Sequence, residues 1–271
     1  MTLREYYDFP DGMNVQQLYV GIYDQEDDDV PCMPSMMYAY YRQTARTVMK
    51  PLNTSNVTDM SYMFQTCTGL VGVPWMDTSN VTTMKNMFYD CDSLMAIPQF
   101  NTSNVTNMAN MFYNCSNLEE IPPLDTSKVT SLEYTFYRCS SLTSLPPMDT
   151  SKVTNFSNML NGCTKLTSLP PMDCSSITTK NYYPVYSNSG LTDVGGFTNM
   201  KMSWDSTYGL AKCSGLTYTS CINILNGLYD FTGNGETPNS NQGKLKVHAN
   251  FLTTVGDELS IGTDKGWTIT T

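Results

Sequence analysis

The sequence predicts an α/β repeat fold, in which units of one short parallel strand and one helix stack into a solenoid that is capped at both ends. Tripeptides of the type Asn/Asp-Thr-Ser begin at residues 53, 77, 101, 125 and 149, a constant step of 24 residues. An Asp-Cys-Ser tripeptide continues the series at residue 173. A period of about 20 to 29 residues matches one strand-plus-helix unit of a solenoid.

The first half of each unit carries apolar residues at helical spacing. In the unit that begins at residue 101 they are Val105, Met108, Met111, Phe112 and Cys115. Steps of three, three, one and three place them on one face of a helix of about three turns. Thr102 or Ser103 can cap the first free N–H groups of this helix.

The second half of each unit predicts a short strand. Leu118 and Ile121 are followed by Pro122, which has no N–H to donate and therefore marks the end of a strand. One unit cannot bury its own apolar face. Stacking places each apolar set on the preceding one and forms a continuous core.

The repeated pattern D/N-T-S-x-V-T-x-M-x-x-M-F-x-x-C-x-x-L-x-x-I/L-P resembles the BspA-type leucine-rich repeat, which occurs in bacterial surface proteins, phage proteins and some protozoan surface proteins. The resemblance covers residues 53–198, and residues 216–230 and 264–268 resemble the closing segment of that family. It implies a leucine-rich-repeat solenoid that serves as a non-enzymatic, surface-displayed interaction scaffold.

Three regions follow from this organisation. Residues 1–52 are expected to form an N-terminal cap and a possible attachment segment, residues 53–198 the solenoid, and residues 199–271 an α/β C-terminal cap. A degenerate repeat lies in the first region, 24 residues before the first regular one, and comprises Met33, Met36, Ala39 and Tyr40. Such an atypical repeat covers an open sheet edge.

The C-terminal cap is expected to contain several local elements. A strand is predicted one residue late in the repeat at residues 191–197, and a further strand at 200–204. A helix is predicted at 219–229 with Ile222, Leu225 and Leu228 facing inward, and a turn at 232–235. Residues 244–248 alternate as a strand, residues 251–261 are expected to be helical in part, and residues 267–270 are the last strand.

Composition limits the partners. The net charge is −10 and the pI about 4.4, so no basic stripe is available for nucleic acid. No stretch is long and apolar enough for membrane insertion, and the N-terminus lacks the apolar region of an export signal. We therefore expect a virion component released by lysis, in preference to an exported protein of the bacterial cell surface.

Five cysteines occupy one column of the repeat: Cys67, Cys91, Cys115, Cys139 and Cys163. Neighbouring strands lie about 4.8 Å apart, which exceeds the roughly 3.8 Å between Cβ atoms that a disulfide prefers. The column therefore predicts a ladder of buried, reduced thiols in preference to disulfides or a metal stack. Cys213, Cys221 and His248 lack a recognised zinc spacing, so no metal site is expected.

A binding surface is predicted on the side of the helix that faces away from the core. Its tyrosines are Tyr62, Tyr89, Tyr113, Tyr134 and Tyr137, and flat amphipathic rings beside asparagine amides are typical of protein- and sugar-binding faces. The alternative is that these rings lie on one another and only cover the core. Trp75 is a second candidate, as an exposed aromatic residue.

Catalysis is not expected. The chain has one histidine, His248, and lacks both a G-x-S-x-G motif and a phosphate-binding loop, so no cofactor is predicted either. The function expected is that of a phage tail or fibre protein that displays a host-recognition surface. Its partners would be other virion proteins and a bacterial surface glycan or protein, and a homo-oligomer is left open. The alternatives are a bacterial surface adhesin without its signal peptide, and a purely architectural decoration of a capsid or tail.

Overall fold

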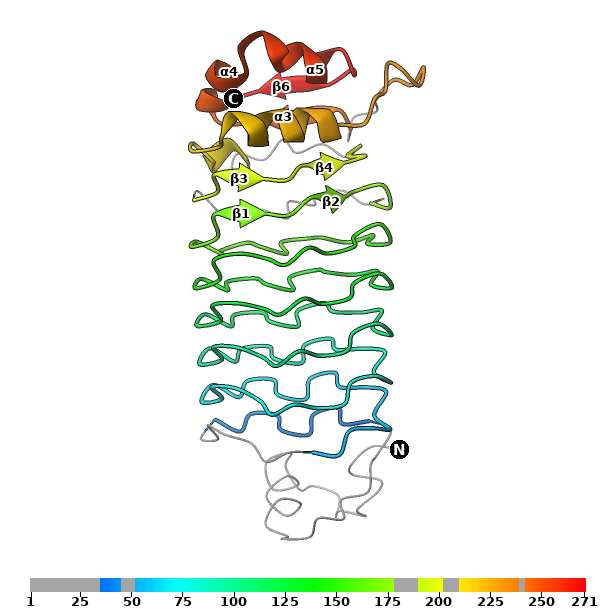
Figure 1. Ribbon diagram of the computed structural model, residues 1–271, viewed down its shortest axis with the longest axis vertical. Coiled ribbons are helices and arrows are strands. Elements are labelled where there is room, and N and C mark those ends of the chain that lie inside the picture. The colour runs from blue at the N-terminus through cyan, green and yellow to red at the C-terminus, as the bar shows by residue number, and fades with distance from the viewer. Residues whose placement is uncertain (1–34, 45–51, 178–189, 202–209, 239–241) are drawn as a thin grey trace.

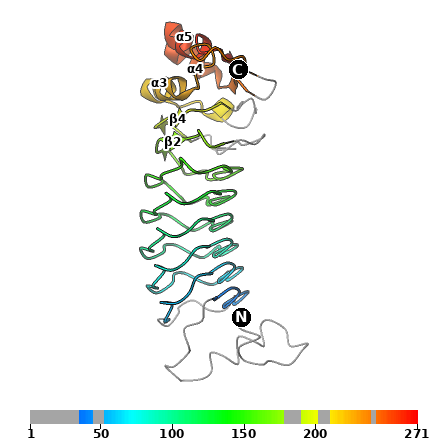
Figure 2. The same cartoon turned by 90° about the vertical axis from the view of Figure 1, so that its right-hand side faces the viewer.

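The computed structural model describes residues 35–44, 52–177, 190–201, 210–238 and 242–271. The chain forms an elongated stack of coils, with the first repeats at one end of the long axis and a helical cap at the other (Figures 1 and 2). Isolated parallel bridges connect successive coils and join Ser35, Asp59, Thr83, Asn107, Ser131 and Asn155 in that order. The 24-residue period of the sequence is therefore the period of the stack.

The predicted helix in each repeat is wrong. In the described residues 52–177 no helix is present, and the main chain instead alternates between two kinds of hydrogen bond. Phe112 N donates to Thr135 O in the next coil at 2.9 Å, whereas Cys115 N donates to Phe112 O within its own coil at 3.1 Å. Residues 107–115 and their equivalents at steps of 24 form one wall of the stack, which we call the bridge wall.

Left-handed residues explain why the bridge wall is not helical. Asn110 and Asn114 have φ values of 56° and 57°, whereas a right-handed helix requires negative φ throughout. Asn tolerates this conformation because its short side chain bonds locally. The equivalent residues with positive φ are Tyr38, Arg42, Tyr62, Thr66, Asn86, Asp90, Tyr134, Arg138, Asn158 and Gly162. Two left-handed positions per coil bring the apolar residues to the same side without a helix.

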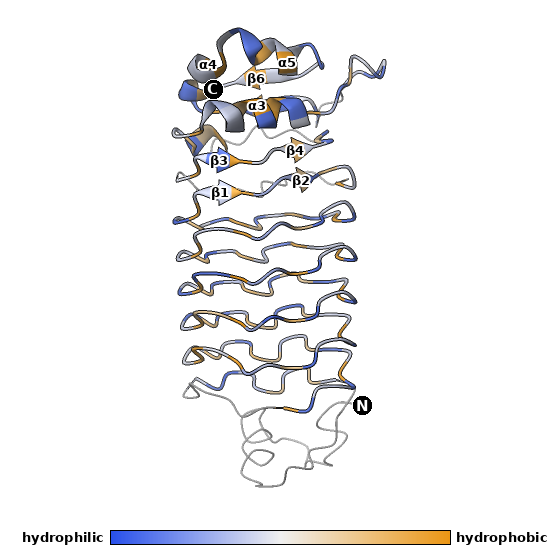
Figure 3. Cartoon of the chain, viewed as in Figure 1, coloured by the Kyte–Doolittle hydropathy of each residue, from blue (hydrophilic) through white to orange (hydrophobic). Residues whose placement is uncertain are grey.

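The predicted core columns are confirmed. Met108, Phe112 and Leu118 have no exposed surface. The rings of Phe64, Phe88, Phe112 and Phe136 stack with successive centroids 5.2, 5.6 and 5.6 Å apart. Figure 3 shows apolar and polar residues alternating along the coils. Burial of one side chain from each coil on its equivalents in the next creates a single core along the long axis.

A column of threonines also links the coils. Thr102 is 1% exposed, and its Oγ1 donates to Asp125 O at 2.9 Å. Asn101 Oδ1 accepts a hydrogen bond from Ser103 N at 3.1 Å and so closes the turn that begins the coil. The expectation that Thr102 or Ser103 caps a helix is therefore wrong, because Thr102 donates across coils instead.

Regular strands appear late in the stack. β1 (Ser168–Leu169) pairs in parallel with β3 (Asp193–Val194), and β2 (Met172–Asp173) pairs in parallel with β4 (Phe197–Thr198). Ser168 lies opposite Asp193, so the offset is 193 − 168 = 25 residues, which confirms the strand predicted one residue late. At the positions equivalent to β1 in earlier coils, a single backbone hydrogen bond connects neighbouring coils, such as that from Glu119 N to Met95 O at 3.2 Å. Residues 118–124 and their equivalents form the second wall, the strand wall.

The degenerate N-terminal repeat is confirmed where the structure describes it. Met36, Ala39 and Tyr40 are buried, and Met36 N donates to Asp59 O at 2.9 Å. Met33 lies outside the described residues.

The C-terminal cap follows its prediction closely. After η1 (Leu210–Lys212), α3 (Tyr218–Gly227) begins at Thr217, whose side chain accepts a bond from Ser220 N. β5 (Lys244–Lys246) pairs in parallel with β6 (Thr268–Thr270). Between these two strands lie α4 (Ala249–Val255), η2 (Gly256–Leu259) and α5 (Ser260–Thr263). The predicted strand at 200–204 is seen as an isolated bridge from Met200 to Leu228, and residues 202–204 lie outside the described part.

The inward face of α3 differs in part from its prediction. Leu225 and Leu228 are buried as expected, and Cys221 and Ile224 are also fully buried. Ile222 is only partly buried. The buried face of α3 is therefore centred on Cys221, Ile224 and Leu225, and Ile222 lies at its edge.

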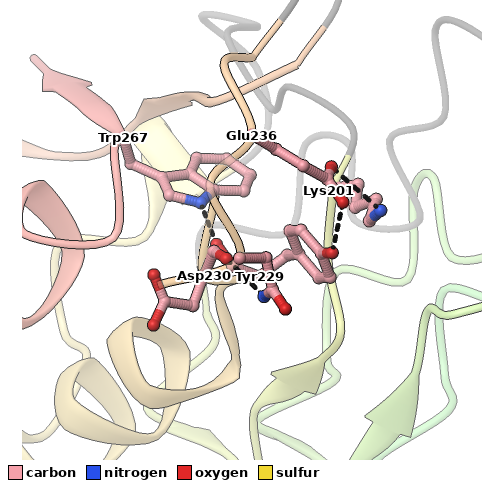
Figure 4. Close-up of polar contacts among 6 residues, drawn as sticks. Lys201, Tyr229, Asp230, Glu236 and Trp267 are labelled. Atoms are coloured by element: carbon pink, nitrogen blue, oxygen red, sulfur yellow. Dashed lines mark hydrogen bonds and ion pairs between the residues drawn. The ribbon is translucent and has the colours of Figure 1, made fainter. Parts of the chain in front are cut away.

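Polar contacts hold the cap together. Trp267 Nε1 donates to Tyr229 O at 2.9 Å, and the Tyr229 hydroxyl donates to Glu236 Oε1 at 2.8 Å (Figure 4). Lys201 Nζ lies 3.8 Å from the centre of the Tyr229 ring and 3.4 Å from Glu236 Oε2. Lys265 Nζ donates to Leu225 O and thereby satisfies a carbonyl at the end of α3.

Candidate binding surfaces

Three tyrosines form a stacked column on the bridge wall. The ring of Tyr113 lies 4.4 Å from that of Tyr89 and 4.6 Å from that of Tyr137, at interplanar angles of 6° and 15°. All three side chains are half-buried. We call Tyr89, Tyr113 and Tyr137 the tyrosine column. The rings cover one another, as the alternative interpretation expected, and they also remain partly accessible.

Tyr134 and Tyr62 take different places. Tyr134 packs against the column, with its ring 5.5 Å from Tyr137 in an edge-on arrangement. Tyr62 instead stacks on Tyr38 at 4.7 Å. The sequence interpretation missed Tyr38, although its position 24 residues before Tyr62 could have identified it. The predicted tyrosines therefore form two aromatic groups on the bridge wall.

The hydroxyls of Tyr89 and Tyr113 are neutral at ordinary pH, because their pKa values are raised. Burial, followed by the neighbouring Tyr89 and Tyr137, raises the pKa of Tyr113 to about 12. Burial and the nearby Asp90 carboxylate raise the pKa of Tyr89. The Arg138 guanidinium lies 5.3 Å from the centre of the Tyr137 ring. The column therefore offers hydroxyls that can donate and accept hydrogen bonds beside flat apolar rings.

Trp75 lies on the strand wall, at the position equivalent to Pro171 immediately before β2. Its side chain is 67% exposed. It borders an open groove of about 440 Å³ whose lining comprises Trp75, Met76, Asp77, Thr78, Gln99, Phe100, Asn101, Thr102, Ser103 and Asp125. The sequence interpretation singled out Trp75 but missed the polar residues beside it.

The thiols of the cysteine column form hydrogen bonds between coils. Cys115 Sγ donates to Phe88 O at 3.1 Å and Cys139 Sγ donates to Phe112 O at 3.1 Å. The five column cysteines are buried, and burial raises the pKa of Cys115 well above its ordinary value. Each thiol uses its hydrogen to satisfy a carbonyl of the preceding coil, so the column serves packing rather than reactivity.

The part of the chain that the structure describes contains neither a metal-binding cluster nor a helix that could span a membrane. His248 Nδ1 accepts a hydrogen bond from Asn250 N at 3.1 Å and caps α4. Among the residues described, no three His, Cys, Asp or Glu side chains are grouped so that they could hold a metal ion. The helices described between residues 210 and 271 are all too short or too polar to cross a membrane.

Comparison with known proteins gives one family match. The model of the family described as "Mycoplasma protein of unknown function, DUF285" matches residues 32–144 and 90–184, which together make up more than half of the chain. No curated protein matches. A solved structure, a leucine-rich repeat protein from Bacteroides ovatus, is similar at 18% identity, with a TM-score of 0.26 over 67% of this chain. This chain covers 62% of the length of that protein.

Proposed function

The chain belongs to the DUF285 family, and we propose that it is a non-enzymatic interaction scaffold, a BspA-type leucine-rich-repeat solenoid that displays a recognition surface on a phage particle. In this proposal it is a tail or fibre component. Its partners are other virion proteins and a glycan or protein of the bacterial surface.

The tyrosine column is the observation that carries this proposal. Its rings lie at 4.4 and 4.6 Å spacing on a wall whose main chain is bonded from coil to coil. The Asn114 N to Tyr137 O bond of 2.6 Å is one such link beside the rings. A rigid row of aromatic rings loses little conformational freedom when a ligand covers it. The column is thus suited to a flat or elongated partner that contacts several coils.

The cysteine column supports the virion setting. Its thiols donate hydrogen bonds to carbonyls, as Cys91 Sγ does to Phe64 O at 2.9 Å, so the stack uses the reduced form of these residues. Free thiols are the rule in cytoplasmic proteins, whereas disulfides are common in exported ones. A phage protein that folds in the host cytoplasm before assembly meets this requirement better than a bacterial adhesin, which is the alternative.

An architectural role is the second candidate. It is favoured by the ring stacking itself, because Tyr113 is covered on both sides by Tyr89 and Tyr137. In that case the column only seals the core, and the chain stiffens or decorates the particle.

The test is binding of the purified chain to candidate host cells, with Tyr89, Tyr113 and Tyr137 replaced together by Asn. Gln65 and Asn161 already occupy this position in other coils, so Asn is compatible with the fold. We expect saturable binding by the parent chain and loss of binding, by about tenfold or more, in the variant. Replacement of the same three residues by Phe keeps the stacked rings and is the matched control.

Circular dichroism and thermal unfolding confirm that each variant is folded. Undiminished cell binding by a folded Asn variant would reject the tyrosine column as the recognition face. If the parent chain binds none of the cells and instead co-purifies with virion proteins, the architectural role is favoured.

A further inference from the structure

The groove beside Trp75 has the features of a second binding site, apart from the tyrosine column. It crosses three levels of the stack, since its lining comes from residues 75–78, 99–103 and 125, which follow one another at about the 24-residue period. Its volume is about 440 Å³ and it is open to solvent. None of the tyrosines of the column lines it. We call it the Trp75 groove.

Trp75 forms an aromatic platform that the repeat does not require. The equivalent positions in later coils hold Gln99, Pro123, Pro147 and Pro171, so smaller residues satisfy the fold there. Trp75 is 67% exposed, while the neighbouring Met76 and Phe100 are 1% and 2% exposed. The Trp75 ring is therefore exposed to solvent on a packed base, and Trp is among the residues enriched at contact surfaces.

Polar side chains line the groove in a fixed order. Asp77, Asn101 and Asp125 occupy the same position of successive coils, and coils connected through parallel backbone bonds lie about 4.8 Å apart. In each of the three, Oδ1 accepts a bond from the N–H of the serine two residues later, at 3.0, 3.1 and 3.0 Å. These bonds orient the three side chains. The second polar atom of each side chain takes no part in them and can contact a ligand.

The second atoms alternate in character. They are Oδ2 of Asp77, Nδ2 of Asn101 and Oδ2 of Asp125, so the row reads acceptor, donor, acceptor. Hydrogen bonds from Ser79 and Ser127 lower the pKa of Asp77 and of Asp125, which keeps both groups as carboxylates. Gln99 is also fixed, because its Nε2 donates to Phe100 O at 3.2 Å. Its Oε1 is then a further acceptor.

This chemistry selects one class of ligand. Sugar hydroxyls donate and accept hydrogen bonds at once and so match an alternating row, and the apolar face of a pyranose ring packs on an indole. The two carboxylates repel an anionic ligand. The Asn101 amide between them donates a hydrogen bond, which a hydroxyl or ring oxygen of a neutral sugar accepts and an ammonium group cannot. We propose that the Trp75 groove binds a neutral glycan, with one sugar ring on Trp75 and adjacent hydroxyls on Asp77, Asn101 and Asp125.

The experiment is a titration of the full chain with neutral hexose and N-acetylhexosamine oligosaccharides, followed by calorimetry and tryptophan fluorescence. A sialylated oligosaccharide and a chitosan oligosaccharide serve as the anionic and cationic controls. We expect saturable binding of a neutral oligosaccharide together with a change in fluorescence. Trp75→Gln, which reproduces the residue found at position 99, should raise the Kd by about tenfold or more.

A second variant tests the polar row. Asp125→Asn preserves the turn, because Asn101 already forms it, but replaces an acceptor by a donor. We expect a severalfold weaker affinity at unchanged thermal stability. The triple Asn variant of the tyrosine column should bind the oligosaccharide as the parent does, so failure of one proposal is distinguishable from failure of the other.

Three results would overturn the inference. They are absence of binding by every neutral oligosaccharide tested, equal affinity of the parent and Trp75→Gln, and binding of the chitosan oligosaccharide alone.

Discussion

In the coil stack, residues 52–177, part of the main chain bonds between coils, whereas in α3 of the C-terminal cap, residues 210–271, the main chain bonds within the helix. In the stack, Phe112 N donates to Thr135 O, 23 residues away. In the cap, Cys221 N donates to Thr217 O, four residues away, at 3.0 Å. A coil thus depends on its neighbour for part of its main-chain hydrogen bonds, whereas α3 forms its main-chain hydrogen bonds within the helix. The difference shows why a stack of this kind needs a closing element whose own main chain is already satisfied.

α3 closes the stack by imitating a further coil with its side chains. Val194 of β3 has no next coil, and its N–H donates to Ser220 Oγ at 2.9 Å while its carbonyl accepts from Asn223 Nδ2 at 3.2 Å. Gly227 permits the close approach, since a Cβ there would lie 2.5 Å from Phe197 O. Side-chain groups therefore cover the strand edge that would otherwise pair with another chain.

The largest effect that we expect is in the stack core. Phe112→Ala removes a fully buried ring between Phe88 and Phe136 and should lower the free energy of unfolding by about 3–5 kcal/mol. Denaturant unfolding followed by circular dichroism measures it. Phe112→Leu is the matched control, because Leu160 is buried at the same position two repeats later. A loss below about 1.5 kcal/mol for the Ala variant would show that the coils do not depend on one another for their packing.

A second pair of variants tests the backbone difference with one residue type. Asn110 is left-handed, with φ 56°, whereas the exposed Asn226 lies in α3. Asn110→Ala should lower the free energy of unfolding by about 1 kcal/mol, because a Cβ residue without local bonding is strained at positive φ. Asn226→Ala should raise it by about 0.5 kcal/mol through helix propensity. Effects of the same sign in both variants would contradict the assigned backbone.

The two regions also differ in how far the sequence predicts them. The core of the stack could be predicted because Val105, Phe112 and Cys115 recur every 24 residues. In a stack of repeats, residues that recur in this way all face the same interior. The local backbone could not, because a spacing of three and four residues is satisfied by repeated turns as well as by a helix. Asn110 and Asn114 carry the signal that separates them, as does Gly162 with φ 83°.

The candidate surfaces show the same limit. The sequence identifies the tyrosines and Trp75 as residue types suited to binding, but not their surroundings. Trp75 and Asp125 are 50 residues apart in the sequence and line one groove. Their proximity depends on the offset between the walls of a coil, which the period alone does not specify. In the cap, by contrast, the predicted strand at 244–248 and helix at 219–229 required only local patterns.

The smallest effect that we expect is a loss of folding stability at acidic pH. Bonds from Ser127 hold the folded-state pKa of Asp125 below its ordinary value of 3.8, and bonds from Ser79 and Ser151 do so for Asp77 and Asp149. A lowered folded-state pKa contributes stability above the unfolded pKa, and this contribution is lost as pH falls through the folded value. We therefore expect the stack to lose stability below about pH 4, by an amount limited by the exposure of these carboxylates.

The variant with Asp77, Asp125 and Asp149 replaced by Asn separates this loss from that of the cap. Asn101 forms the same turn without a charge, so the stack should fold and its stability should vary less between pH 5 and pH 3. The cap retains an acid response of its own, because bonds from Tyr229 and Lys201 lower the pKa of Glu236. Thermal unfolding at several pH values, read by the fluorescence of Trp267 for the cap in a chain with Trp75 and Trp204 replaced by Phe and by circular dichroism for the stack, resolves the two responses. An unchanged pH dependence of the stack would mean that its turns do not distinguish carboxylate from carboxylic acid.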